Sequence, residues 1–363
     1  MKKNWIKSIA LLTSIVTVAV SSLTGCSNTN TQSSTVAATG GTNVADGNDN
    51  VFRMAFAGDI VSLDPAYGYD GITCKIQPQV LETLLTFNAQ NELVDQLITG
   101  WSQPDELTYV YEVRDDIVFS DGNPMTMEDV LFSIEHHQDP EVASYLSWMF
   151  DGVESIEQTG DWEFTVKLTE PNACFKYVFA TSAGMVFEKS FYEENPEEFG
   201  KPGRGVVATG AFKFDSWTSG TEIVLSKNEN YRDASDVEWD KCIFEIISED
   251  LTQVKALTSG QVNMIFDPSL DVMSNVEEAS GLDMQLVDTM GSVFLSFNNA
   301  SGYFTDENVR KACAYAIDEA SMVDNVLYGY GKATKNTPVN ASLYVSYREG
   351  WEKQYDNELV DYS

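Results

Sequence analysis

Two segments of the chain alternate apolar and polar residues with a period of two. In the first, Tyr109, Tyr111 and Val113 share one face. In the second, residues 162–168, large apolar residues alternate with Glu, Thr and Lys. A period of two is that of a strand with one buried face, and clean alternation is typical of antiparallel sheets. The pattern therefore predicts two half-buried antiparallel strands.

Helical signals occupy other segments. Thr126 as N-cap, with Asp129 at the third helical position, predicts the start of a helix. Residues 79–85 predict a helix that follows a strand at 51–57 and a loop at 58–65. Thr305 as N-cap before a small-residue helical face predicts another, which we expect to pack against a strand at 293–298. This mixture indicates the α/β class.

The N-terminal pattern is different. Lys2, Lys3 and Lys7 precede an apolar run at 9–20, which ends in Leu-Thr-Gly-Cys at 23–26. A basic segment followed by a short apolar one predicts a signal peptide at 1–25, because a transmembrane helix needs about 20 apolar residues.

Leu-Thr-Gly-Cys resembles the lipobox of bacterial lipoproteins, which implies that Cys26 carries a lipid. The alternative is a secreted protein with a chance cysteine at the cleavage site. The polar residues up to 50 lack large apolar side chains and predict a flexible tether at 26–50, about 25–30 Å in mean span. We therefore expect a protein anchored by lipid on the extracytoplasmic face of a bacterial cell membrane.

Charge excludes one class of partner. The chain has 22 basic and 56 acidic residues, and loss of the three signal lysines would leave a net charge of −37. Such a surface repels nucleic acid. A solvated acidic surface explains the charge better than a dedicated cation site, so charge alone names no ligand.

The remaining cysteines are Cys74, Cys174, Cys242 and Cys313, widely spaced and without a C-x-x-C motif. They could form two disulfides in three pairings. The apolar surroundings of Cys174 and Cys313 favour buried free thiols instead.

The only histidines, His136 and His137, are adjacent. Neighbours point different ways on a helix, so they predict a solvated pair and no metal site or cofactor. A Ser-His-Asp or Cys-His enzyme would have to use one of them, and no Gly-x-Ser-x-Gly motif is present. A surface glycoside hydrolase with paired catalytic carboxylates remains an alternative, because 56 acidic residues make any chosen pair uninformative.

Several passages together resemble the family-5 solute-binding proteins of bacterial ABC importers, the group that includes oligopeptide, dipeptide and nickel binders. They are 60–65 (IVSLDP), 81–85 (LETLL), 118–126 (VFSDGNPMT) with 128–130 (EDV), 209–214 (TGAFKF), 228–231 (NENY) and the stretch from Phe297-Asn298 to 309–318 (VRKACAYAID).

The resemblance implies an α/β, two-lobed, periplasmic-binding-protein-like fold that closes on its ligand by hinge motion. It places lobe I at 51–91 and 196–290, an extra subdomain of lobe I at 92–195, and the start of lobe II at 291–363. Members of the family usually extend further, so we expect lobe II to be incomplete. In peptide binders the acidic partner of the peptide amino terminus comes from that further part.

The resemblance implies a non-enzymatic, monomeric receptor that captures di- or oligopeptides and delivers them to membrane permease subunits. A nickel, metal-complex or oligosaccharide binder of the same family, and a surface receptor without transport, remain alternatives. The candidate ligand contacts are Gly58, Ser62, Tyr67, Tyr69, Ser292 and Phe294.

Overall fold

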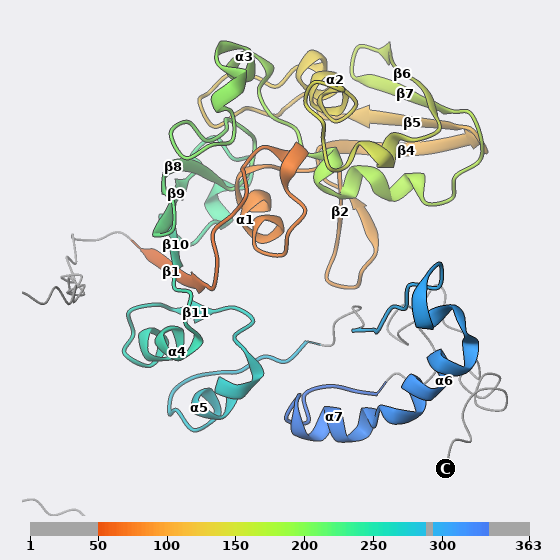
Figure 1. Cartoon of the computed structure of the whole chain (residues 1–363). Coiled ribbons are helices and arrows are strands. Elements are labelled where there is room, and N and C mark those ends of the chain that lie inside the picture. Colours follow the sequence, from red (N-terminus) through yellow and green to blue (C-terminus); the bar gives the residue numbers. More distant parts are fainter. Residues whose placement is uncertain (1–49, 288–292, 334–363) are drawn as a thin grey trace, which may run out of the picture. The chain divides into compact units, whose positions relative to one another are not determined.

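The computed structural model describes residues 50–287 and 293–333 (Figure 1). One sheet has the order β11-β1-β10-β9-β8, with β1 parallel to both of its neighbours and β9 antiparallel to both β10 and β8. Its strands are β1 (Val51–Phe56), β8 (Phe212–Thr218), β9 (Glu222–Lys227), β10 (Lys241–Ile246) and β11 (Met264–Ile265). The predicted strand at 51–57 is confirmed as β1.

A second sheet has the order β4-β5-β7-β6 and is antiparallel throughout. Its strands are β4 (Ile98–Asp105), β5 (Thr108–Val113), β6 (Val153–Gly160) and β7 (Glu163–Leu168). The two period-two patterns are therefore confirmed as β5 and β7, which pair directly. A separate short hairpin joins β2 (Leu85–Phe87) to β3 (Leu93–Asp95).

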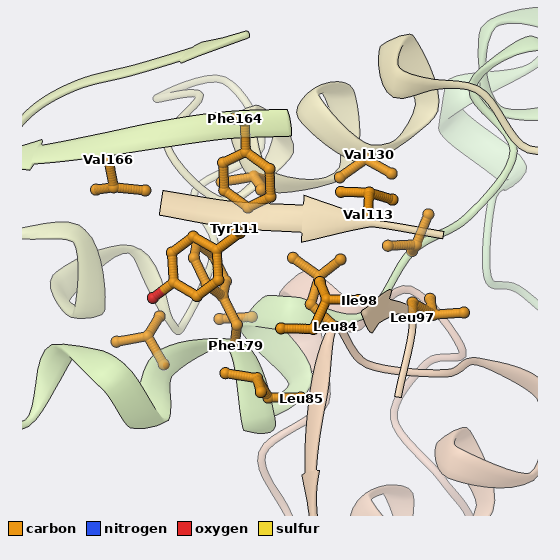
Figure 2. Packing of buried hydrophobic residues seen from close by; sticks show 14 of the residues in the cluster. Leu84, Leu85, Leu97, Ile98, Tyr111, Val113, Val130, Phe164, Val166 and Phe179 are labelled. Atoms are coloured by element: carbon orange, nitrogen blue, oxygen red, sulfur yellow. The ribbon is translucent and has the colours of Figure 1, made fainter. Parts of the chain in front are cut away.

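Aromatic rings pack among aliphatic side chains in the core beside the second sheet (Figure 2). Tyr111 on β5 lies opposite Phe164 on β7, and their rings stack with centroids 5.0 Å apart. Phe179 meets Tyr111 edge-on at 5.0 Å. Offset and edge-to-face rings are the favoured aromatic geometries, so the alternating pattern produces a specific core as well as a buried one.

The helices are α1 (Thr73–Val80), α2 (Met127–His136), α3 (Lys189–Glu194), α4 (Asp250–Thr258), α5 (Met273–Glu277), α6 (Glu307–Ala316) and α7 (Glu319–Asn325). The predicted start of α2 is confirmed, because Thr126 and Asp129 form a complete capping box. This reciprocal bonding satisfies two backbone N–H groups that the helix leaves free.

Three local predictions are wrong. The helix expected at 79–85 already ends at Val80, since the Leu84 N–H donates to the Gly184 carbonyl at 2.9 Å and the following residues enter β2. The N-cap of α6 is Asp306, one residue after the predicted Thr305. Residues 293–298 form no strand, and no residue of α6 is buried in the described part of the chain.

Candidate ligand-binding surface

The loop that follows β1 carries four of the six predicted ligand contacts, and its first turn is tied to the neighbouring hairpin. The Asp59 carboxylate accepts hydrogen bonds from Trp217 Nε1 at 2.9 Å and from the Gly220 N–H at 2.8 Å. Trp217 belongs to β8, so the loop is fixed to the far edge of the first sheet. Gly58, immediately before Asp59, is half-buried.

Ser62 lies beneath the surface of this loop. Its hydroxyl donates to the Gly200 carbonyl at 3.2 Å and accepts from the Asp64 N–H at 3.0 Å. Gly200 has a φ of 71°, and a Cβ added there would lie 2.2 Å from the Asp64 nitrogen. The close approach requires glycine at this position, and it leaves the Ser62 hydroxyl engaged within the chain.

Three tyrosines gather where the loop ends, and we call Tyr67, Tyr69 and Tyr145 the tyrosine surface. The Tyr145 ring meets Tyr67 edge-on at 5.8 Å and Tyr69 edge-on at 4.9 Å. Tyr69 is 64% exposed and Tyr145 is 53% exposed, whereas Tyr67 is half-buried. Exposed tyrosines offer apolar area and a hydroxyl at low cost in side-chain entropy, which suits a binding surface.

Tyr67 ties the two segments together. Its hydroxyl donates to the Val142 carbonyl at 2.7 Å, 75 residues further along the chain. Burial, and then the nearby Asp64 carboxylate, raise the pKa of the Tyr67 hydroxyl above its ordinary value. The hydroxyl therefore stays protonated and continues to donate at neutral pH.

Both histidines lie in the interior next to this surface, so the prediction of a solvated pair is wrong. His136 is 4% exposed and His137 is fully buried. His136 Nε2 lies 3.0 Å from a carboxylate oxygen of Asp64, and His137 Nδ1 lies 2.9 Å from the Ser144 hydroxyl. Polar partners in two other segments make their burial possible, and the sequence does not show those partners.

The remaining predicted sites lie elsewhere or outside the described residues. Phe294 is 78% exposed, and Ser292 and the lipidation candidate Cys26 fall in ranges that the structure does not describe. Tyr145 was not among the predicted contacts, and neither was Trp148, which follows it by three residues and is 63% exposed. The sequence signal that could have indicated these two contacts is the number of aromatic residues in the loop that follows the predicted helix.

The described cysteines are all free thiols, but they are not uniformly buried. Cys242 is buried, Cys313 is partly exposed, and Cys74 and Cys174 are exposed. The expectation of burial is therefore wrong for Cys74 and Cys174. Cys174 precedes the helical turn of buried Phe175 instead of sharing its interior position.

Neither a metal cluster nor a membrane span occurs in the described ranges. No group of three or more His, Cys, Asp or Glu side chains is placed there to hold a metal ion. No described helix is both long and apolar enough to cross a bilayer.

Solved structures identify the fold. The periplasmic binding protein DppA of Helicobacter pylori, in complex with the peptide STSA, matches with a TM-score of 0.69 and 25% identity over 80% of this chain and 61% of that one. NikZ of Campylobacter jejuni, in complex with Ni(L-His), matches with a TM-score of 0.68 and 23% identity over 80% and 57%. The predicted fold class is confirmed as that of the two-lobed periplasmic binding proteins, and the coverage fits a chain with part of the second lobe.

The chain belongs to the bacterial extracellular solute-binding proteins, family 5, whose profile matches residues 92–360. This is a family of binding proteins, in agreement with the expectation that the chain is not an enzyme. A relative is the dipeptide-binding protein DppE of Bacillus subtilis, 24% identical over 301 residues, which are 78% of this chain and 53% of the relative. The chain thus spans about half the length of the curated relatives that it matches.

Proposed function

We propose that this protein captures peptides outside the membrane and delivers them to the permease subunits of an ABC importer. Membership of family 5 supports the proposal, as do relatives named as dipeptide- and oligopeptide-binding proteins. The observation on this chain that carries it is the exposed pair Tyr69 and Tyr145, whose rings meet edge-on although they come from two segments far apart in the sequence. Peptide side chains can pack on such rings while water and main-chain groups complete the binding.

We further propose that Tyr69 and Tyr145 contact the ligand directly, with Tyr67 behind them. Gly58 and Ser62 then shape the loop from inside, in keeping with the engaged Ser62 hydroxyl. Ser292 and Phe294 are proposed as contacts from the start of lobe II, so that the ligand lies between two lobes that close on it. The proposed boundaries are 51–91 and 196–290 for lobe I, 92–195 for its subdomain and 291–363 for the start of lobe II.

Peptide binding is testable by thermal unfolding of the full chain with and without a defined mixture of di- to pentapeptides. A ligand that binds only the folded state stabilises it by about 2.7 kcal/mol at a hundredfold excess over Kd, so the Tm should rise by several degrees.

Tyr145→Ala should weaken binding about tenfold or more, because truncating a central aromatic contact typically costs over 1 kcal/mol. Tyr177→Ala, which removes a tyrosine that stacks on Phe87, is the matched control and should leave affinity unchanged.

The same titration separates the alternatives. NikZ holds Ni(L-His), so a nickel–histidine complex is the second ligand to test, followed by an oligosaccharide mixture. A Tm that rises with either of these and stays constant with peptides would replace the proposed ligand. Affinity for peptides that Tyr145→Ala leaves intact would move the ligand away from the tyrosine surface.

We also propose that residues 1–25 are a signal peptide, that the tether begins at a lipid-bearing Cys26, and that the anchored protein acts as a monomer. A single acyl chain binds membranes only marginally, so stable attachment requires two or more chains on this cysteine. Cys26→Ser should therefore move the exported protein from the membrane fraction to the soluble fraction and abolish its labelling by a fatty-acid precursor. Membrane retention of the serine variant would contradict the anchor.

A further inference from the structure

Two adjacent histidines end the second helix and reach two different segments below the tyrosine surface. His136 is the last residue of α2 and His137 is its C-cap. His136 contacts Asp64 in the loop that carries Tyr67 and Tyr69. His137 contacts Ser144, next to Tyr145. Each segment with an exposed tyrosine is therefore bonded to one histidine.

Ser144 links His137 to the loop that carries Tyr67. Its hydroxyl oxygen accepts from the Leu146 N–H at 3.1 Å and lies 3.2 Å from the Ala66 carbonyl, to which it can donate. The same hydroxyl lies 2.9 Å from His137 Nδ1, which donates or accepts according to the tautomer of the ring. These contacts join His137, Ser144 and Ala66 in one chain.

The two histidines act on one residue of the loop, Ala66. Asp64, which His136 contacts, accepts from the Ala66 N–H at 2.9 Å. The Ala66 carbonyl accepts from Ser144 at 3.2 Å and from the Tyr145 N–H at 3.0 Å. Both polar groups of Ala66 are thus held by side chains that a histidine supports, and Ala66 immediately precedes Tyr67.

The histidine rings are themselves confined by aromatic neighbours. His136 meets Phe187 edge-on at 5.2 Å and Tyr192 edge-on at 4.9 Å. His137 stacks on Phe150 with centroids 6.1 Å apart and an angle of 22°. Rings packed in this way have little rotational freedom, and their burial prevents direct contact with a ligand.

We propose that His136 and His137 are positioning residues, which set the spacing of Tyr69 and Tyr145 and thereby the affinity of the tyrosine surface for its ligand. This inference rests on the proposed function for the identity of the ligand. The claim that the histidines hold the two tyrosine segments in place can be tested without any ligand. Affinity depends on preorganisation, because a surface that must be ordered on binding loses part of its interaction energy.

The test compares variants that keep or remove each bond. His137→Asn retains a hydrogen-bonding group near the position of Nδ1, whereas His137→Phe removes it and keeps a ring. His136→Gln and His136→Phe form the corresponding pair for Nε2. Ser144→Ala breaks the chain without altering either histidine, which covers the case in which a phenylalanine variant fails to fold.

Two readouts are measured on the full chain. Hydrogen exchange of residues 142–148 and 64–69 should rise in the two phenylalanine variants and in Ser144→Ala. Peptide affinity should fall about tenfold in the same variants, because the net contribution of one hydrogen bond corresponds to about that change in Kd. It should stay within about twofold in the Asn and Gln variants, which can keep the bond. Gln253→Leu is the control: it removes a partly buried hydrogen bond of 2.7 Å to the Ile247 carbonyl, in another part of the chain.

The outcomes distinguish this proposal from a general effect on stability. Gln253→Leu should lower the Tm while leaving exchange of residues 142–148 and peptide affinity as in the wild type. If His137→Phe and Ser144→Ala lower only the Tm in the same way, the positioning role is overturned. If the wild-type chain binds no peptide, the proposed function fails, and the exchange of residues 142–148 and 64–69 alone decides whether the histidines hold these segments.

Discussion

Arg232→Met is expected to lower the free energy of unfolding by about 3 kcal/mol, because it leaves a buried carboxylate without its charged partner. Arg232 Nη1 lies 2.6 Å and 2.7 Å from the two carboxylate oxygens of Glu82. The Glu82 side chain is 3% exposed and Arg232 is 21% exposed. Removal of the more accessible partner therefore leaves the less accessible charge behind.

The pKa of Glu82 gives this variant a pH signature. Burial raises the pKa of Glu82 above its ordinary value, while Arg232 and Gln96 act in the opposite direction. Loss of Arg232 should raise that pKa further. A carboxyl whose pKa is raised on folding contributes stability at low pH and loses it as pH rises through the folded pKa, so Arg232→Met should be most defective at neutral and alkaline pH.

Urea unfolding between pH 5 and 8 measures both effects. Arg53→Met is the matched control, because the Arg53–Glu245 pair at 3.0 Å is more exposed, at 40% and 15%, and should contribute about 1 kcal/mol or less. The double variant Glu82→Met with Arg232→Met should recover most of the loss, since replacing both members of a buried pair by apolar residues is often neutral. Equal losses in Arg232→Met and Arg53→Met would contradict the assigned role of the buried pair.

Acid is expected to destabilise the protein by about 3 kcal/mol between pH 7 and pH 4 through His137 alone, at 1.36 kcal/mol for each unit of pKa difference. Burial, and then the neighbouring His136, lower the pKa of His137 from 6.5 to about 4, while Asp64 and the Ser182 backbone act in the opposite direction. Above pH 6.5 the ring is neutral in both states. As pH falls, the unfolded chain takes up the proton first, so folding becomes less favourable down to about pH 4.

The difference between the wild type and His137→Asn isolates this contribution. Asparagine does not titrate, so the free energy of unfolding of the variant should fall less steeply between pH 6.5 and pH 4. Carboxyl groups with raised pKa values, such as Glu188, titrate in both proteins and cancel in the comparison. Parallel stability curves across this range would show that His137 already binds a proton in the folded protein near its ordinary pKa.

Local signals predicted the elements that depend on neighbours in the chain. The alternation at 108–113 and 162–168 predicted β5 and β7, because a strand with one buried face needs a period of two. Thr126 and Asp129 predicted the start of α2, because a capping box is complete within four residues. The six passages that resemble family 5 predicted the family and fold class before any contact was known.

Elements that depend on distant partners were predicted less well. Residues 81–85 have helical spacing, yet Leu84 bonds to Gly184 and Gln96 instead of continuing α1. Residues 293–298 have strand composition but no paired strand in the described ranges. A strand requires hydrogen bonds to a second segment, and composition does not supply that segment.

The candidate site shows the same division. The sequence by itself determined the family, the α/β class and the loop after β1 that carries Tyr67 and Tyr69, since these depend on short motifs and on local periodicity. Only the tertiary structure decided that Tyr145 joins them and that two apparently solvated histidines lie buried beneath. The physical reason is that a buried polar side chain is stable only with a hydrogen-bonding partner, and Asp64 lies 72 residues from His136 in the chain.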